Sequence, residues 1–324
     1  MINLPSTLGK AFIVSALAPM FVFVLLNVTF VPGNILPLIS LLTMPSASPI
    51  LKVLGIELSD ITLLLIPSVF AILLNALNTP IIRLFEGAYG FQRNFLLKWM
   101  LERNKQKHES LYGDLLAYQK QLQKSDDELE RQGLRREINQ TYERLYTGLD
   151  GDGFSLPVDR RRLMPTRFGN IWGVIEEYPS LRYGMDGMTL WPRMVSVIGK
   201  EYSELLADSK MTMDALLNAS LLAIIFGIEM AAVSITQATM LNVTLVVGSF
   251  VAAYLLYQTA VTTLLEMGEL IKSCFDVHRG ALLSRFGLSL PVGDITAERQ
   301  VWSRLTRYIL AGDADDYPAL PPKI

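Results

Sequence analysis

Two membrane-length apolar stretches in the second half of the chain limit its possible folds more than any other feature. They cover about 215–236 and 241–265, and only a few residues separate them. At about 1.5 Å per residue, a helix of about 20 apolar residues crosses a hydrocarbon core of about 30 Å. The pattern therefore predicts two transmembrane helices that pack as an antiparallel hairpin.

A first hairpin is predicted near the N-terminus, with spans at about 12–30 and 60–79. Pro19 is expected to kink the first span, and Pro80 is expected to end or bend the second. The connection 31–59 is apolar and rich in proline, but its apolar pieces are too short to cross a membrane. We expect it on the outer side, at the interface or tucked into the bundle.

The overall composition places the chain in the membrane class. Of its 324 residues, 51% are hydrophobic, and the mean hydropathy is +0.32, which is too apolar for an ordinary soluble protein. The net charge of −2 gives no field that would attract nucleic acid. A single cysteine, Cys274, excludes an intramolecular disulfide and a thiol cluster for a metal.

The distribution of basic residues sets the expected orientation. The connection 31–59 contains Lys52 as its only base, whereas many bases follow the second span and face only Glu86 and Glu102. The positive-inside rule then places the middle of the chain in the cytoplasm, and four spans bring both termini to the same side of a bacterial inner membrane. The bases are Arg83, Arg93, Lys98, Arg103, Lys105 and Lys107.

The predicted fold is an all-α membrane protein with four transmembrane helices in two hairpins. The first hairpin occupies 1–83, a helical cytoplasmic domain 84–212, the second hairpin 213–266, and a helical cytoplasmic tail 267–324. The fourth helix is expected to continue past Glu266 towards Phe286, and Asp294 to cap a last helix at 295–310. The tail ends in an acidic, proline-containing segment.

A charged helix pair is expected within the middle domain. Residues 109–123 are polar and favour a helix, and a capping box from Ser125 to Glu128 predicts the start of a second helix. The two would stand as an antiparallel pair, either as a solvated stalk or as an oligomer contact.

Polar side chains inside the spans are the first candidates for function. Glu229 is the only charged residue in the two stretches of the second hairpin, and an intramembrane carboxylate is costly enough to suggest a role. The alternative is a carboxyl near the far interface that is protonated or bonds to Asn242, Thr244 or Thr239. The amide candidates for interhelical hydrogen bonds or a pore lining are Asn75, Asn78, Asn218 and Gln258.

Small residues at helix-contact spacing predict where the second hairpin packs. Gly227 and Ala231 lie four residues apart on its first helix, and Gly248 and Ala252 on its second. Such pairs allow helix backbones to approach closely in lipid. Glu229 points away from the face that carries Gly227 and Ala231.

The segment 156–193 combines aromatic residues, prolines, glycines and arginines, and we expect a compact, turn-rich element. Arg167, Arg182 and Arg193 could form internal salt bridges with Asp186, Glu176 and Glu177. The arginines could equally bind anionic lipid headgroups or hold a specific small ligand. A nucleotide site would lack its usual glycine-rich loop and lysine. The candidates are Arg160, Arg161, Arg162, Arg167, Arg182, Asp186 and Arg193.

Three runs in this segment resemble a signature of uncharacterised bacterial multi-pass membrane proteins. They are Thr166-Arg-Phe-Gly-Asn170, Tyr183-Gly-Met-Asp186 and Trp191-Pro-Arg193. The resemblance covers this part of the middle domain. It implies a location in a bacterial membrane and supplies no activity.

The sequence favours a protein without enzymatic activity. It contains no HExxH, CxxC, GxSxG or P-loop pattern, and it suggests no cofactor. We expect an oligomeric platform anchored in the membrane, or a subunit of a larger membrane assembly. The alternative is a homo-oligomeric ion channel, because the order of spans is similar to that of bestrophin-type channels, although none of their motifs is present. The expected partners are the lipid bilayer, further copies of the chain or other membrane subunits, and no nucleic acid.

Overall fold

The computed structural model describes residues 9–31, 58–89, 94–146, 155–291 and 293–312, and these ranges are all-helical, without a strand. The all-α prediction is therefore confirmed for the described part of the chain. The proline-rich connection and the acidic end lie almost wholly outside these ranges.

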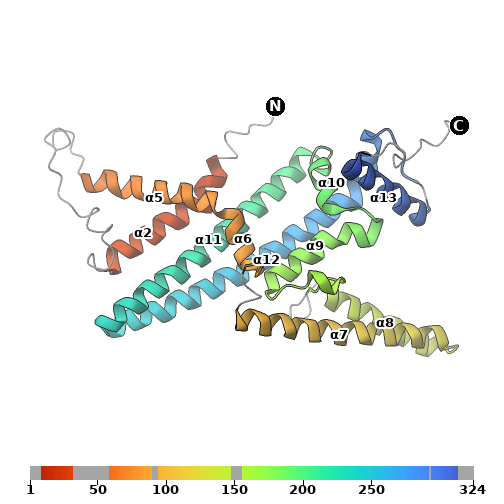
Figure 1. The fold of residues 1–324 in the computed structure, drawn as a ribbon, viewed down its shortest axis with the longest axis horizontal. Helices are drawn as coiled ribbons and strands as arrows, with labels where there is room; N and C mark the ends of the chain where they lie inside the picture. Colours follow the sequence, from red (N-terminus) through yellow and green to blue (C-terminus); the bar gives the residue numbers. More distant parts are fainter. Residues whose placement is uncertain (1–8, 32–57, 90–93, 147–154, 292, 313–324) are drawn as a thin grey trace. The chain divides into compact units, whose positions relative to one another are not determined.

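The chain divides into two compact units. The first comprises 1–82 and 208–263, and the second comprises 83–207 and 264–324. Two long helices, α11 (Lys200–Thr236) and α12 (Met240–Arg285), contribute residues to both units (Figure 1). The continuation of the fourth helix towards Phe286 is thus confirmed.

The described helices include three that are long and apolar enough to cross a membrane: Gly9–Phe30, α11 and α12. A fourth span is possible as a bent pair, in which Leu65–Ala76 is followed by Asn78–Glu86 at an angle of 57°. These are the helices of a multi-pass membrane protein.

Pro80 explains the bend between α5 (Leu58–Ala76) and α6 (Asn78–Glu86). Proline has no N–H to donate to the carbonyl four residues earlier, and its ring crowds that carbonyl. The affected carbonyl belongs to Ala76, so the helix breaks one turn before the proline. The sequence prediction of a break or bend is confirmed, but at Leu77 rather than at Pro80 itself.

Pro19 changes the first helix in a similar way. A π-helical turn, η1 (Ile13–Leu17), precedes α2 (Ala18–Phe30), which has Pro19 in its first turn. In a regular α-helix the N–H of residue 19 would bond to the Ser15 carbonyl, and proline cannot supply it. The Asn218 side chain of α11 donates to that carbonyl at 2.7 Å.

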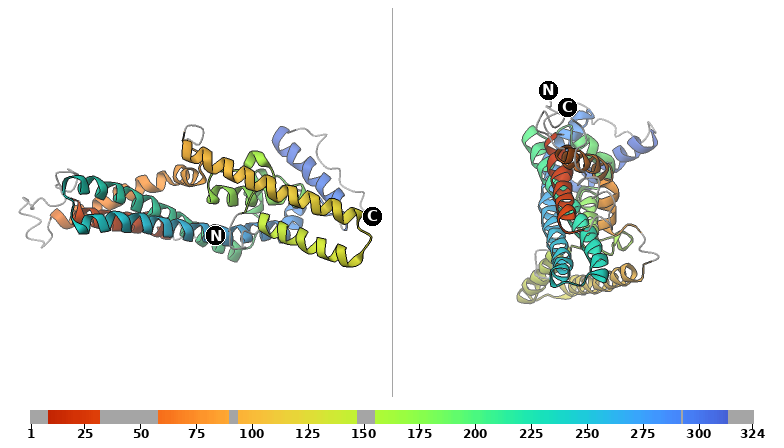
Figure 2. Two further views of the ribbon diagram at one scale, coloured as in Figure 1. Left: turned by 90° about the horizontal axis from the view of Figure 1, so that it is seen from below. Right: turned by 90° about the vertical axis from the view of Figure 1, so that its left-hand side faces the viewer.

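Within the first unit, α11 and α12 run side by side (Figures 1 and 2). The Ser220 hydroxyl donates to the Ala253 carbonyl at 2.9 Å, which ties the two helices together. Gly227 lies against Ser249 and Phe250, and a Cβ at this position would meet both at about 3.2 Å. Further along, Phe226, Met230 and Val233 are buried in an apolar cluster with Val31.

The second unit is built on a buried core that joins four helices. The C-terminal part of α12 packs with α9 (Arg167–Tyr183), α10 (Gly187–Met194) and α13 (Ile295–Ala311), and Trp302 and Phe275 are almost completely buried there. Asp294 accepts from the N–H groups of Thr296 and Ala297, as predicted for the cap of the last helix. The helices that complete this unit are α7 (Phe95–Lys124), α8 (Glu128–Tyr146), η2 (Arg160–Arg162), α9 (Arg167–Tyr183), α10 (Gly187–Met194) and α13 (Ile295–Ala311).

Helices α7 and α8 lie side by side as the expected charged pair (Figure 1). The predicted capping box differs in detail. Helix α8 begins at Glu128 itself, and Asp127 accepts from the N–H of Leu129 at 3.1 Å. The Ser125 hydroxyl instead donates to the Glu130 carboxylate, because α8 begins two residues later than a capping box at Ser125 requires.

The prediction of a turn-rich element at 156–193 is wrong, since most of this segment is helical. Its glycines and prolines serve close packing within helices. Gly173 of α9 lies so near the Pro157 ring that a Cβ would be 2.8 Å from it, and Pro179 is accommodated inside α9. Among Gly173, Pro179 and Gly184, only Gly184 marks a turn, at the end of α9, whereas the other two lie inside the helix.

Candidate functional site

The Thr-Arg-Phe-Gly-Asn run builds the start of α9 and fixes it to its neighbours within the second unit. The Thr166 hydroxyl accepts from the Gly169 N–H at 3.0 Å and donates to the Glu86 carbonyl at 2.9 Å. A Cβ on Gly169 would clash with the same Glu86 carbonyl. Asn170, fully buried, bonds to both the N–H and the carbonyl of Met164. Thr166, Gly169 and Asn170 therefore each have a structural role.

Asn104 of α7 completes this junction. Its side-chain amide is 5% exposed and donates to the Met164 carbonyl at 2.8 Å and to the Pro165 carbonyl at 3.2 Å. The Met164 carbonyl thus accepts from both Asn104 and Asn170. Asn104 was not predicted from the sequence, where its only distinguishing feature is that it is an asparagine within a charged, solvated helix.

The Tyr-Gly-Met-Asp run forms the corner between α9 and α10. Gly184 ends α9 in the left-handed conformation, with φ of 72°, which favours glycine. Asp186 then caps α10: its carboxylate accepts from the N–H groups of Met188 and Thr189 and from the Thr189 hydroxyl. The Asp186 carboxylate is thus used within its own turn.

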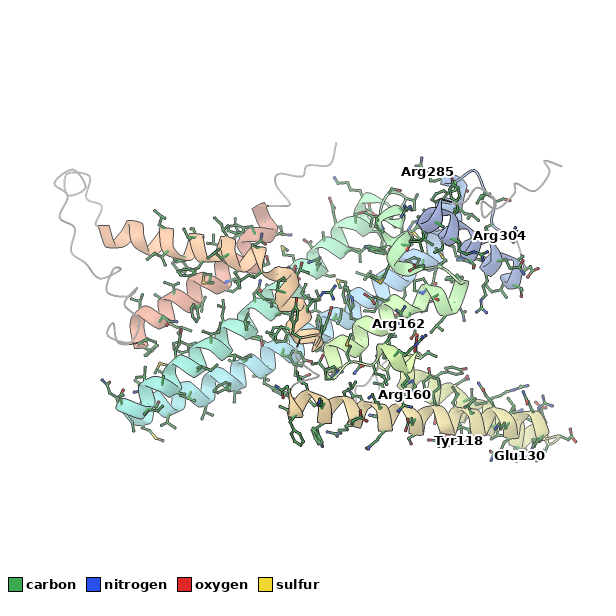
Figure 3. The ribbon with its side chains drawn as sticks, viewed as in Figure 1. Tyr118, Glu130, Arg160, Arg162, Arg285 and Arg304 are labelled. Atoms are coloured by element: carbon green, nitrogen blue, oxygen red, sulfur yellow. The ribbon has the colours of Figure 1, made fainter. Side chains whose placement is uncertain are left out.

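The three consecutive arginines of η2 each have a carboxylate nearby. Arg160 pairs with Glu109 of α7 at 2.7 Å, and Arg162 lies 4.0 Å from Glu176 of α9; both arginines are labelled in Figure 3. Arg161 bonds to both oxygens of Asp159 and lowers the pKa of that carboxyl to about 2. Internal ion pairing was one of the three options from the sequence. Glu176 was an expected partner, but of Arg167, Arg182 or Arg193 rather than of Arg162.

The remaining arginine candidates are spread along two helices. Arg193 donates to the Thr189 carbonyl at 2.7 Å, and the Arg182 carbonyl accepts from Arg299 of α13. Arg167 is the first residue of α9. Glu177, which was expected to pair with an arginine, is 6% exposed and accepts from the backbone N–H groups of Val158 and Asp159. In the described contacts, these charged residues therefore have several different structural roles.

A polar network in the second unit was missed by the sequence analysis. Asp276 of α12 accepts from the hydroxyls of Tyr178 and Tyr183, at 2.9 and 2.7 Å. Burial, reinforced by these hydrogen bonds, raises the pKa of both phenols. Beside them, Arg279 lies 4.3 Å from the centre of the Tyr183 ring and pairs with Glu298 at 2.8 Å. The network joins α9, α12 and α13.

Among the intramembrane candidates, Asn218 and Asn78 join helices of the first unit. Asn218 is 1% exposed and holds the Ser15 carbonyl, while Asn78 donates to the Asp214 carboxylate at 2.8 Å. Lys210 bonds to the same carboxylate at 2.6 Å. Asn75 is exposed, and the side chain of Gln258 is half-buried on α12.

Glu229 lies on the wall of a cavity of about 550 Å³ within the first unit. The cavity is lined by α2, α5, α6 and α11, almost entirely with apolar side chains. Its second polar side chain is Asn27 of α2, which is 5% exposed and interacts with Glu229. The partners suggested from sequence are engaged elsewhere, since Asn242 bonds to the Gln237 carbonyl and to Thr239.

The small-residue pairs of the second hairpin have different surroundings. Gly227 contacts α12 and Ala231 is half-buried, but Gly248 has no neighbouring heavy atom within 4 Å and Ala252 is exposed. The contact with α11 is made by Ser249 and Ala253 because these residues lie about 100–140° around the helix from Gly248. The close packing of another helix against Gly248 and Ala252 stays a prediction.

No group of histidine, cysteine, aspartate and glutamate side chains suited to a metal ion occurs in the part of the chain that the structure describes. Comparisons of the chain with protein-family models, with curated proteins and with solved structures found no match.

Proposed function

We propose that this chain is a non-enzymatic integral membrane protein that forms an oligomeric, membrane-anchored platform, either alone or as a subunit of a larger assembly. The observation that carries the proposal is an outward stripe on α12 that has the small residues Gly248 and Ala252 at its centre. The stripe is a continuous exposed face of the apolar part of this helix. Its members are Leu241, Thr244, Gly248, Ala252, Leu255, Thr259 and Thr262.

The opposite face of α12 packs against its own unit. Ser249, Ala253 and Ala260 are buried there, whereas only 11% of the most apolar window of the helix is buried. In lipid, helices associate mainly through close packing, and glycine and alanine four residues apart let two backbones approach. Gly248 and Ala252 have this spacing, so a helix of a second copy or of another membrane subunit fits this face.

The second unit would form the platform on the cytoplasmic side. The start of α7 exposes Phe95, Leu96 and Trp99 beside the bases Lys98 and Arg103. Apolar and basic side chains together favour the headgroup region of an anionic membrane surface. With the bases that follow the second span, this supports a cytoplasmic position for the unit, both termini on that side, and a location in a bacterial inner membrane.

The mass of the particle in lipid nanodiscs or detergent tests the proposal. We expect several copies in the wild-type particle, or co-purified membrane subunits, and we expect Gly248→Leu to release them because a leucine keeps the helices apart. Ala232→Leu is the matched control, since Ala232 is an exposed alanine of α11. A wild-type particle that contains a single chain and nothing else would sink the proposal.

A homo-oligomeric ion channel is the second candidate. The α12 stripe carries the hydroxyls of Thr244 and Thr259, which donate to carbonyls one turn earlier and keep their oxygens as acceptors. In a closed ring these oxygens would line a central path for cations. Planar-bilayer recordings decide: a cation-selective current that changes in Thr259→Val supports the channel, whereas silent oligomers support the platform.

A further inference from the structure

The cavity beside Glu229 presents an occupant with a wall of carbon. Its lining side chains are apolar apart from those of Glu229 and Asn27. Asn27 forms a side-chain hydrogen bond with the Glu229 carboxylate, and its amide also donates to the Phe23 carbonyl at 3.1 Å. The Glu229 Oε2 and Asn27 Oδ1 atoms are buried in the protein. The two polar groups therefore interact within the wall and offer the cavity little surface.

The cavity opens beside apolar side chains that are themselves exposed. Four members of its lining, Phe70, Leu73, Leu77 and Ile225, are between 37% and 53% exposed. They lie on α5, at the break after it and on α11, and both helices contribute to candidate membrane spans. An opening at this place faces hydrocarbon rather than water, and an apolar cavity stays dry. The occupant should therefore come from the bilayer.

The size of the cavity decides between a helix and a thinner occupant. Along α2 the lining extends from Met20 to Val28, a rise of about 12 Å. A helix about 10 Å wide and of this length would fill roughly 900 Å³. The cavity has a volume of about 550 Å³, which is within the range of small-molecule sites, about 300–1,000 Å³. A helix of a second copy is thus too large, whereas a single alkyl chain is narrow enough.

We propose that this cavity holds an uncharged hydrocarbon chain, which is either one acyl tail of a membrane lipid or a free apolar molecule. The chain would lie between α2, α5, α6 and α11 and make the van der Waals contacts that the wall of an empty cavity forfeits. Because the lining comes from four helices, an occupant would stabilise their packing. The proposal is independent of the oligomer proposed above, because every lining residue belongs to one unit of one chain.

Photolabelling of the full-length protein in phosphatidylcholine nanodiscs tests this site. One sample contains a small share of phosphatidylcholine with a diazirine in its acyl chain, and a second contains diazirine-bearing hexadecane. Peptide mapping compares the lining residues of α2 and α11 with Val247 and Val251, which are exposed on α12 outside the cavity. We expect at least fivefold more labelling in the lining, because a held chain has protein around it whereas lipids at an exposed surface exchange.

Filling the cavity should abolish this excess. Val28→Phe places a ring at a half-buried position of the lining, and labelling should fall to the level of the α12 surface. Ile225→Trp obstructs the opening and gives a second, independent test if Val28→Phe does not fold. Val69→Phe is the matched control, because Val69 is exposed on α5 and outside the lining. Glu229→Gln should leave labelling unchanged, since the chain does not bind through the carboxylate.

The two probes distinguish the sources of the chain. Labelling by the phosphatidylcholine probe, with or without labelling by hexadecane, assigns the cavity to a lipid tail. Labelling by hexadecane alone assigns it to a free apolar molecule. Equal labelling of the lining and of the α12 surface with both probes would overturn the proposal. So would an excess that persists in both Val28→Phe and Ile225→Trp, or one that disappears in Glu229→Gln.

Discussion

The side-chain amide of Asn218 donates to the backbone carbonyl of Ser15 at 2.7 Å, across 203 positions of sequence. The bond reaches the carbonyl that Pro19 cannot serve in a regular helix. It therefore connects a defect in the first helix to the middle of α11, and it offers a direct test of how the membrane-spanning helices are held together.

Replacing Asn218 should weaken the first unit. Asn218→Ala leaves the Ser15 carbonyl without this donor, and interhelical hydrogen bonds in membranes are worth about 0.6–2 kcal/mol. We expect a loss of this size in the free energy of unfolding, measured by denaturant titration in detergent micelles. Asn75→Ala serves as the control, because Asn75 is an exposed amide on α5. Equal stability of the two variants would contradict the role assigned to Asn218.

Gly169 should not tolerate even a methyl group. In Gly169→Ala the new Cβ would clash with the Glu86 carbonyl and lie 2.7 Å from the Met164 Cβ, so we expect a loss of about 1–3 kcal/mol from overpacking. Gly133→Ala is the control: nothing lies within 4 Å of that position in α8, and alanine there should add about 0.5–1 kcal/mol. Opposite shifts in melting temperature are the expected result.

The ion pair between Arg279 and Glu298 should matter more than an exposed pair. Glu298 is 6% exposed at its side chain, and it also accepts from the Trp302 indole at 3.3 Å. Glu298→Ala leaves both donors unpaired, and we expect a loss of about 3 kcal/mol in the free energy of unfolding. Glu269→Ala removes an exposed partner of Lys272 and should cost at most about 1 kcal/mol. Comparable losses would argue against a buried network.

The two tyrosines bonded to Asp276 predict a loss of stability in alkali. The pKa of each phenol is higher in the folded protein than the ordinary value of 10.0, so the folded state holds these protons more tightly than the unfolded chain. Their stabilising effect is complete below pH 10 and is lost as the pH rises above that value. We expect the melting temperature to fall over this range.

The double variant Tyr178→Phe, Tyr183→Phe separates this effect from general alkaline unfolding. It lacks both titrating hydroxyls, so its melting temperature should depend less steeply on pH above 10 than that of the wild type. Parallel curves for the two proteins would show that these phenols titrate normally.

The sequence by itself determined the class of the protein and the ends of several helices. Apolar runs of membrane length, with Glu229 as the only charge in two of them, require helices because a lipid-exposed backbone must satisfy its own hydrogen bonds. The cap at Asp294 was also predictable, since capping depends on residues within one turn. Pro80 fixed a bend in the same local way.

Only the tertiary structure decided which polar groups meet and what the segment 156–193 becomes. Its glycines and prolines resemble turn signals, but Gly169 is needed for the approach of the Glu86 carbonyl, which lies 83 positions earlier in the chain. Asn27 attracted no attention in the sequence and became notable only because α2 brings it to the cavity of Glu229. Helix formation follows from neighbours within a few residues, whereas such pairings depend on how distant segments pack, and a single sequence does not encode that in any local pattern.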